Sequence, residues 1–396
     1  MITFEQAYQI IRQQVVPLSS ERVNLYECLG RVLAEDIFSD MDMPPFNKSA
    51  VDGFACRMED ITGETQNFSF LHIVETIPAG VTPGKKISAG QCSKIMTGSM
   101  LPEGSDCVVM VEDTETLDEN QIRVLKTGTA RNICYIGEDI KKGDKLLEKG
   151  KLLAPQHIGV LATAGVVNPL VYRKVKVAVI STGNELVEPD EIPAHSKIRN
   201  SNASQLMAQL TQTFSLAKYY GIATDDEQSL TVKIAVALET NDVVILTGGV
   251  SMGDFDYVPG VLEKTGVKIL FDSIAVQPGR PTVFGKFNGQ FIFGLPGNPV
   301  SSFVIFGLLV KPFLMGLMGC TEEFSSILLP LGKDLIRTKS SRKSMIPVRI
   351  VKSELFPIET HGSAHINAWS EANGIVAIEI GQTSIKKGQL VNVRQI

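Results

Sequence analysis

Three polar loops carry the side chains of this chain that are best suited to chemistry, and each one follows an apolar run. The first loop, residues 181–186, has the sequence STGNEL, and its small residues would let a ligand approach the backbone. A following helix N-terminus favours an anion, and the carboxylate of Glu185 would face that site. The alternative is a strand-to-helix turn whose glutamate is only solvated. The other candidate binding residues of this loop are Ser181, Thr182 and Gly183.

The second loop, residues 247–257, has the sequence TGGVSMGDFDY. Its glycines allow close backbone approach, and Asp254 and Asp256 supply hard oxygen ligands of the kind that Mg²⁺ prefers. Either aspartate is also a suitable N-cap for the next helix, and for Asp256 the sequence leaves both interpretations open. The other candidate binding residues of this loop are Gly248, Gly249 and Ser251.

The third region combines two proline-stiffened turns, QPGRP at residues 277–281 and GLPGNPVSS at residues 294–302. One turn bears Arg280 and the other opens a helix with Ser301, which together predict a phosphate cradle. Any tight turn uses proline and glycine at this density, but GLPGNP is more specific because it stands between an expected strand and a long helix. The other candidate binding residues here are Gly279, Gly297 and Asn298.

Further acids and hydroxyls stand beside turns. Asp225 and Asp226 follow an expected strand, where a helix N-cap is the plainer interpretation. Asp52, Thr97 and Asp139 each stand at a glycine turn, where the alternative is an Asx-turn or ST-turn. The chain has neither a Walker A loop nor a GxGxxG, which disfavours ordinary ATP or dinucleotide binding.

A sheet must bring the three loops together, and residues 174–322 predict one. Continuous apolar strands at residues 176–181 and 242–247 are typical of a parallel sheet that is covered on both faces. Helices are expected at residues 202–214 and 225–239, so strands alternate with helices as in a doubly wound α/β domain. Ligands of such folds bind at the carboxyl ends of the strands.

The rest of the chain predicts three more regions, so we expect a multidomain α/β plus β protein. Residues 1–43 and 144–173 are expected to form a helical linking domain, with helices continuing to about residue 40. Residues 44–143 contain short alternating segments broken by glycine and proline, which predict an inserted β domain. Residues 323–396 predict a C-terminal β domain after the α/β domain.

The composition disfavours several classes of protein. A net charge of -5 gives no basic field for a nucleic-acid backbone. The six cysteines are dispersed without a CxxC, so neither a zinc site nor a disulfide framework is expected, and a reducing cytoplasm fits best. The apolar residues 303–318 contain Lys311 and Pro312 and are too short and broken for a membrane span, which favours a buried helix or a subunit contact.

Taken together, these loops resemble the molybdopterin molybdenumtransferases, the family that includes the C-terminal part of gephyrin. The resemblance spans essentially the whole chain through seven strings in the family's order: NKSAVDGFA, IMTGS, GEDI, STGNEL, GGVSMGDFDY, QPGRP and GLPGNPVSS. Each string alone is weak evidence, and seven in order are strong evidence. The resemblance implies the four regions above and an elongated homodimer whose active site combines the α/β domain of one subunit with the β domain of the other.

An enzyme of this family is expected to convert adenylylated molybdopterin and molybdate to the molybdenum cofactor and AMP, assisted by Mg²⁺. Carboxylate-held Mg²⁺ neutralises the charge that develops when a pyrophosphate is cleaved, so we expect Glu185 and Asp256 to hold the metal and Arg280 to bind the terminal phosphate. By matching positions, the resemblance implies an acidic cluster of Glu185, Asp225 and Asp256, with Asp52, Thr97 and Asp139 as its counterparts on the facing β domain.

Three positions depart from the family pattern. Many relatives carry lysine where this chain has Ser273 and Gln277, and arginine where it has Cys134. Fewer cations are expected to weaken the hold on an anionic substrate, unless Arg131 or Lys268 compensates.

Two rival functions stay open from the sequence. A molybdopterin adenylyltransferase uses a similar α/β domain and consumes ATP, but the helical region and the two β regions favour the insertion step. A non-catalytic pterin-binding scaffold is the rival of a different class, and the acidic loop residues argue against it.

Overall fold

The computed structural model describes residues 1–62, 69–126, 129–251, 257–322, 326–359 and 365–396. These residues form two compact units, each with its own core. Unit 1 comprises Met1–Glu35, Lys149–Ile158 and Asn168–Ile396, and unit 2 comprises Asp36–Glu148 and Gly159–Val167.

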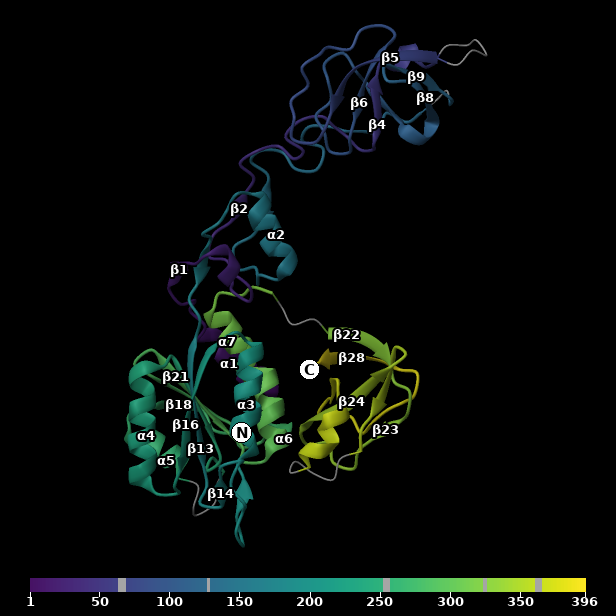
Figure 1. Cartoon of the computed structure of the whole chain (residues 1–396). Helices are drawn as coiled ribbons and strands as arrows, with labels where there is room; N and C mark the ends of the chain where they lie inside the picture. Colours follow the sequence, from purple (N-terminus) through teal and green to yellow (C-terminus); the bar gives the residue numbers. More distant parts are fainter. Residues whose placement is uncertain (63–68, 127–128, 252–256, 323–325, 360–364) are drawn as a thin grey trace. The chain divides into compact units, whose positions relative to one another are not determined.

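A six-stranded sheet is the centre of the α/β part of unit 1 (Figure 1). Its strand order is β16 (Leu216–Ala223), β13 (Lys176–Thr182), β17 (Val243–Thr247), β21 (Gln290–Leu295), β20 (Val283–Phe287) and β18 (Lys268–Phe271). The first four strands are parallel, and β20 runs antiparallel to both of its neighbours, β21 and β18. The chain runs from β13 outward to β16 and then returns past β13 to β17. Such a reversal of strand order opens a crevice for ligands at the carboxyl ends of the strands.

Helices cover both faces of this sheet, as Figure 1 shows: α4 (Glu227–Thr240) and α5 (Val258–Lys264) on one face, α3 (Ser201–Gln212) and α6 (Pro299–Ile305) on the other. Strand β13 contributes to both cores, because Ala178 and Ile180 pack with α4 and α5 whereas Val177 and Val179 pack with α3 and α6. A strand that is buried on both faces needs a continuous apolar run. The expected doubly wound α/β domain is confirmed.

One apolar helix of unit 1 spans Pro299–Leu317. It passes from α6 through a π-helical segment, Phe306–Val310, into α7 (Lys311–Leu317). The expectation that this stretch is short and broken at Lys311 and Pro312 is therefore wrong. Pro312 lies in the first turn of α7, directly after the π-helical segment. The wider π turn leaves room for the proline ring, so the helix continues although proline donates no backbone hydrogen bond. The helix is long and apolar enough to cross a membrane, but 72% of its apolar window is buried in the protein, as in a core helix.

The N-terminal helix is shorter than expected. Helix α1 (Phe4–Gln13) starts at a capping box on Thr3 and buries Ala7 and Ile11, as the spacing of its apolar residues predicts. Helix as far as residue 40 was expected, and this is wrong, because the following residues form short strands, a single 3-10 turn and isolated bridges. Pro17 lies just beyond the helix and cannot continue its hydrogen-bond ladder.

The C-terminal part of unit 1 is a mainly antiparallel sheet, which confirms the expected C-terminal β domain. Its strand order is β19 (Val276–Gln277), β24 (Lys343–Val351), β26 (Gly374–Ile378), β28 (Leu390–Gln395) and β22 (Ser326–Pro330), and β25 (Glu354–Pro357) pairs with β24. Strand β19 comes from the α/β part of the chain and pairs with β24 through Val276 and Lys343. This pairing places the turn at residues 277–281 directly beside the C-terminal sheet.

Unit 2 is built on a six-stranded mixed sheet, as its alternating segments predict. Its core includes the buried side chains of Phe54, Leu71 and Ile122. The strand order is β7 (Cys107–Met110), β4 (Gly53–Cys56), β6 (Gln91–Ile95), β5 (Ser69–Ile77), β9 (Gln121–Val124) and β8 (Thr114–Asp118). Short ladders join β2 (Ile37–Phe38) to β11 (Lys145–Leu147) and β3 (Lys48–Ser49) to β10 (Ile133–Cys134), and α2 spans Pro155–Thr163.

Candidate functional site

The loops after β13, β17 and β21 lie at one edge of the α/β sheet. Ser181 pairs with Thr247, and Thr247 pairs with Leu295, so the three strands end side by side. Asn202, near the start of α3, is buried and ties two of the loops together. Its Nδ2 donates to Oγ1 of Thr247 at 2.8 Å and to the carbonyl oxygen of Gly297 at 2.7 Å. The strand ends and these hydrogen bonds therefore bring the three predicted loops to a common edge.

In the first loop, the carboxylate of Glu185 lies close to the backbone of Gly183. Gly183 has a φ of +147°, and a Cβ atom added there would lie 2.6 Å from Oε2 of Glu185. The Glu185 side chain is exposed, and its oxygens contact no hydrogen-bond donor among the described residues. Ser181 and Thr182 are buried, and the Ser181 hydroxyl donates to Oδ1 of Asn200 at 3.1 Å. The carboxylate of Glu185 is thus free to bind a ligand, whereas the Ser181 hydroxyl serves the fold.

A strand, rather than the expected helix, follows this loop. Strand β14 (Leu186–Val187) pairs in parallel with β15 (Ile198–Arg199), and α3 begins only at Ser201. The expectation of a helix N-terminus beside Glu185 is wrong, because the chain first makes this two-strand ribbon.

Asp225 is joined to the first loop rather than to a helix. Its backbone N–H donates to Oδ1 of Asn184 at 3.1 Å, and its Oδ2 accepts the backbone N–H of Asn184 at 2.9 Å. Asp226 is the N-cap of α4 and accepts the backbone N–H of Ser229 at 2.7 Å. The N-cap interpretation is therefore right for Asp226 and wrong for Asp225.

The second loop approaches the first through its glycines. A Cβ atom on Gly248 would lie 2.4 Å from the carbonyl oxygen of Thr182, and one on Gly249 would lie 2.9 Å from the Thr182 hydroxyl. That hydroxyl is buried and has no hydrogen-bond partner within the described ranges. Ser251 is exposed at the end of the described part of the loop. Asp254 and Asp256 lie outside the described residues.

The third loop opens the long helix as its sequence predicts. Asn298 precedes α6 without making a capping hydrogen bond through its side chain. The Ser302 hydroxyl is buried and donates to the carbonyl oxygen of Pro296 at 2.5 Å. Ser301 is also buried, but it lies on the side of α6 that lines a cleft.

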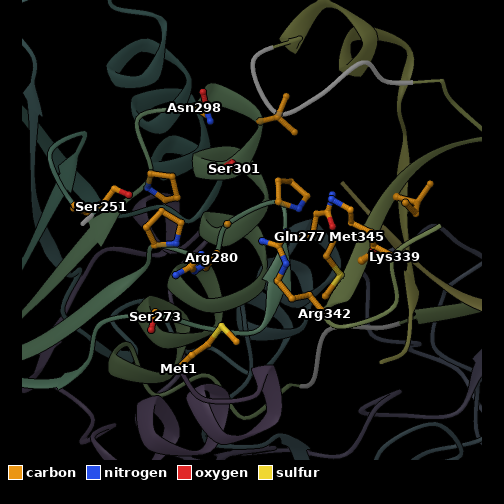
Figure 2. Close-up of a pocket in the computed structure, with 18 of the residues that line it drawn as sticks. Met1, Ser251, Ser273, Gln277, Arg280, Asn298, Ser301, Lys339, Arg342 and Met345 are labelled. Carbon is orange, nitrogen blue, oxygen red and sulfur yellow. The ribbon is translucent and has the colours of Figure 1, made fainter. Parts of the chain in front are cut away.

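This cleft, of about 1150 Å³, is formed by the third region and the C-terminal sheet (Figure 2). Five residues predicted to bind a ligand line it, and the C-terminal part of the chain contributes three cations. The predicted residues are Ser251, Gly279, Arg280, Asn298 and Ser301, and the cations are Arg337, Lys339 and Arg342.

The cleft carries more positive than negative charge. The side chains of Arg280, Lys339 and Arg342 form no ion pair or hydrogen bond with any part of the chain that the structure describes. Arg337 differs, because its guanidinium donates to the carbonyl oxygen of Arg342 and to the Ser344 hydroxyl, each at 2.6 Å. Asp272 is the only acid among the described lining residues. Unpaired guanidinium and ammonium groups on both walls suit an oxyanion ligand.

In unit 2 the structure joins two of the three predicted residues. The Oδ1 atom of Asp52 accepts the backbone N–H of Thr97 at 2.7 Å and its hydroxyl at 2.9 Å. These bonds hold the pKa of the exposed Asp52 carboxyl below its ordinary value. Asp139 is also exposed, and its backbone N–H donates to the carbonyl oxygen of Met43 at 3.1 Å. Among the described residues, no hydrogen bond joins Asp139 to Asp52 or Thr97.

Three family models match successive parts of the chain. Residues 2–165 match the MoeA N-terminal region (domain I and II), residues 178–316 match a probable molybdopterin binding domain, and residues 330–396 match the MoeA C-terminal region (domain IV). The chain is 36% identical over 398 residues to the molybdopterin molybdenumtransferase of Staphylococcus epidermidis, which covers 99% of this chain and 95% of that relative.

The chain belongs to the molybdopterin molybdenumtransferase family.

Further comparisons agree with this membership. The molybdopterin molybdenumtransferase of Staphylococcus aureus (strain COL) is 34% identical over 397 residues, again covering 99% of this chain and 95% of the relative. A crystal structure of the molybdopterin biosynthesis MoeA protein from Pyrococcus horikoshii OT3 superposes with a TM-score of 0.86 at 29% identity over the whole of both chains. A second crystal structure of the Pyrococcus horikoshii protein has a TM-score of 0.81 at 32% identity, covering 100% of this chain and 99% of the other.

Two of the three expected departures from the family pattern, Ser273 and Gln277, line the cleft. The third, Cys134, lies on β10 in unit 2 and does not line it. Arg131 and Lys268 were the two candidates to compensate, and neither is among the lining residues, whereas Lys339 and Arg342 are. Sequence reasoning missed these two residues, although the basic segment 337–343 was a visible signal. They lie far from the loops in sequence, and only the pairing of β19 with β24 brings them to the cleft.

Proposed function

We propose that this molybdopterin molybdenumtransferase converts adenylylated molybdopterin and molybdate to the molybdenum cofactor and AMP. The observation that carries the proposal is the cleft, which Arg280, Lys339 and Arg342 line without described partners, together with Ser301 of α6. Molybdate is an oxyanion, and an adenylylated pterin carries a diphosphate bridge. Both substrates are therefore anions of the kind that such a positive, partly enclosed surface favours.

Arg280 binds the terminal phosphate of the pterin substrate in this proposal. Its planar guanidinium can donate two parallel hydrogen bonds to a phosphate, and no acid of the described residues competes for it. Lys339 and Arg342 add positive charge from the C-terminal sheet. An Arg280→Ala variant with unchanged pterin affinity would remove this role.

Mg²⁺ is the metal that the acidic loops would hold, and the described residues fit it. Glu185 offers an exposed carboxylate without a described partner. Asp225 follows β16, and its two hydrogen bonds with Asn184 hold it against the loop that carries Glu185. Mg²⁺ is commonly bound by one or two carboxylates together with water and substrate phosphates. We assign the metal to Glu185 and Asp256, and Asp256→Ala with wild-type AMP release would contradict the second assignment.

The chain's own groups position the diphosphate. When bound, Mg²⁺ neutralises charge that develops as the phosphate bond breaks. Gly248 and Gly249 pack closely against Thr182 of the first loop, and we assign both to substrate binding, with the backbone N–H of Gly249 as a donor to a phosphate oxygen. Asn298 and Ser301 line the cleft, and Gly297 directly precedes Asn298. We assign these three residues to substrate binding, with Gly183 and Thr182 at the metal side.

We infer further that the enzyme acts in the cytoplasm as a homodimer with shared active sites. The free thiols of all six cysteines suit a reducing compartment. Asp52, Thr97 and Asp139 of one copy would serve the acidic loops of the second copy. When equal amounts of inactive Asp52→Ala and Glu185→Ala chains exchange subunits at random, about half of the dimers are mixed, and each mixed dimer has one intact site. About a quarter of the wild-type activity should therefore return. No recovery in demonstrably mixed dimers would contradict shared sites.

The reaction itself is tested by supplying the purified chain with adenylylated molybdopterin, molybdate and Mg²⁺. Release of AMP without added ATP is the expected result. A folded chain that releases no AMP, or that consumes ATP and molybdopterin instead, would contradict the proposed insertion step.

A further inference from the structure

A run of side-chain hydrogen bonds lies beneath the first loop. The Ser181 hydroxyl donates to Oδ1 of Asn200 at 3.1 Å, and Nδ2 of Asn200 donates to the Tyr219 hydroxyl at 2.8 Å. The Tyr219 hydroxyl in turn donates to Oε1 of Glu188 at 2.8 Å. Ser181 and Asn200 are almost fully buried, at 0% and 1% exposure, so this run links the interior of the sheet to a surface carboxylate.

The carboxylate at the end of this run anchors the ribbon that carries Glu185. Strands β14 and β15 form the ribbon, and Glu188 follows β14 directly. At the other end, the backbone N–H of Ile198 donates to the carbonyl oxygen of Glu185 at 2.8 Å. The backbone N–H of Asn200 donates to the carbonyl oxygen of Val187 at 2.9 Å, between these two points. Glu185 is thus held by a short ribbon that Asn200 and Tyr219 fix to the sheet.

Tyr219 is suited to this link because a hydroxyl donates and accepts hydrogen bonds at once. Burial, and then the hydrogen bond to Glu188, raise the pKa of Tyr219 above its ordinary value. The hydroxyl therefore keeps its proton and continues to donate to Glu188. A phenylalanine at this position would leave the Asn200 amide and the Glu188 carboxylate without their shared partner.

We propose that Tyr219 is a positioning residue for the reaction, because its hydroxyl, bound between Asn200 and Glu188, holds the ribbon that presents the Glu185 carboxylate to the metal ion. The inference rests on the proposed function, in which Glu185 binds Mg²⁺. A carboxylate that is already held in its binding position loses less freedom when the ion binds, so releasing the ribbon should weaken Mg²⁺ binding more than it slows the reaction.

The experiment measures Mg²⁺ binding to the full chain by isothermal titration calorimetry, and AMP release over a range of Mg²⁺ concentrations, and the two midpoints should shift together. For Tyr219→Phe, we expect the Mg²⁺ concentration at half-maximal rate to rise about tenfold, the scale on which residues behind a metal ligand act. The rate at saturating Mg²⁺ should stay close to that of the wild type. Glu188→Ala should shift the midpoint in the same direction, and Glu188→Gln should restore it, because an amide oxygen accepts the same hydrogen bond.

Tyr220→Phe is the matched control. Tyr220 is the next residue of β16, is half-buried like Tyr219, and its hydroxyl contacts Oγ1 of Thr240 at 3.1 Å and Nδ2 of Asn241 at 2.9 Å, away from the ribbon. We expect this variant to keep the wild-type Mg²⁺ midpoint.

Two results would overturn the positioning role: wild-type midpoints in both Tyr219→Phe and Glu188→Ala, or an equal shift in Tyr220→Phe. The Glu188 variants keep the test decisive if Tyr219→Phe does not fold, because Glu188 is only half-buried and lies outside the core. A wild-type chain that releases no AMP at any Mg²⁺ concentration would instead refute the proposed function, and the inference with it.

Discussion

Arg342 reaches the cleft from the segment before β24 and has no described partner for its guanidinium. We expect Arg342→Ala to weaken binding of adenylylated molybdopterin about tenfold or more, because a hydrogen bond to a charged group contributes about 1.5–3 kcal/mol. Fluorescence of Trp369 gives the measurement, since this is the chain's single tryptophan and it lines the same cleft.

Arg349→Ala is the control for that substitution. Arg349 belongs to β24, is exposed, pairs with Glu371 at 3.3 Å and does not line the cleft. Equal loss of affinity in both variants would show that general positive charge, rather than the cleft cation, attracts the substrate.

Gly183 supports a second prediction at the scale of a residue. Alanine at this position would be strained by its φ of +147° and would displace the Glu185 carboxylate, which lies 2.6 Å from the added Cβ atom. We expect Gly183→Ala to lower the free energy of unfolding by about 1–3 kcal/mol and to raise the Mg²⁺ requirement of AMP release. Gly289→Ala also has a positive φ but meets no atom within 4 Å, so it should cost stability without changing the Mg²⁺ requirement. Matching Mg²⁺ midpoints in the two variants would contradict the role of Glu185.

At the candidate site, the sequence predicted which polar residues are present better than it predicted the hydrogen bonds that they make. It left Asp225 and Asp226 as equivalent helix caps, and only the fold separates them, because Asn184 reaches Asp225 from another loop. It proposed Ser181 as a ligand-binding residue, although burial commits that hydroxyl to Asn200. Such assignments depend on contacts between residues that are far apart in sequence.

At the scale of the elements, one ion pair fixes the start of two central strands. Arg173 donates to both carboxylate oxygens of Asp242, at 2.8 and 2.6 Å, and Oδ2 of Asp242 also accepts the backbone N–H of Lys176 at 2.8 Å. Burial alone would raise the pKa of Asp242, but these hydrogen bonds and the charge of Arg173 hold it below its ordinary value.

The sign of this pKa shift predicts how stability changes with pH. Because the pKa of Asp242 is lower in the folded state, its contribution is fully present above the ordinary aspartate pKa of about 4 and is lost as the pH falls through the folded value. Asp242→Asn should lower the free energy of unfolding near neutral pH by about 2 kcal/mol. Urea unfolding should show this difference shrinking below about pH 4. A difference that is constant across that range would contradict the assignment.

Element types were predictable wherever the hydrophobic period was clear. Strand β13 and helix α1 follow directly from a continuous apolar run and from the spacing of Ala7 and Ile11. The antiparallel strands β18 and β20 and the ribbon of β14 with β15 were not expected, because such short strands show too few residues to establish a period. A buried helix was expected over residues 303–318, but its unbroken course through Pro312 was not, since a π-helical segment is not visible in the apolar pattern.

At the scale of the whole molecule, family membership was predictable from the order of short motifs, and the match along the full chain confirms it. The division into residues 1–43 with 144–173, 44–143, 174–322 and 323–396 remains our proposal for the domains. The cleft was not predictable, because it is completed by cations of the C-terminal part of the chain, at least 35 residues beyond the last of the loops in sequence.

The most direct test of the account follows molybdenum and AMP together in a single turnover. The chain is incubated with adenylylated molybdopterin, molybdate and Mg²⁺, and both released AMP and pterin-bound molybdenum are quantified. We predict equal amounts of the two products in the wild type and a parallel loss of both in Glu185→Ala. Release of AMP with no molybdenum bound to the pterin would contradict the claim that this chain is the insertase.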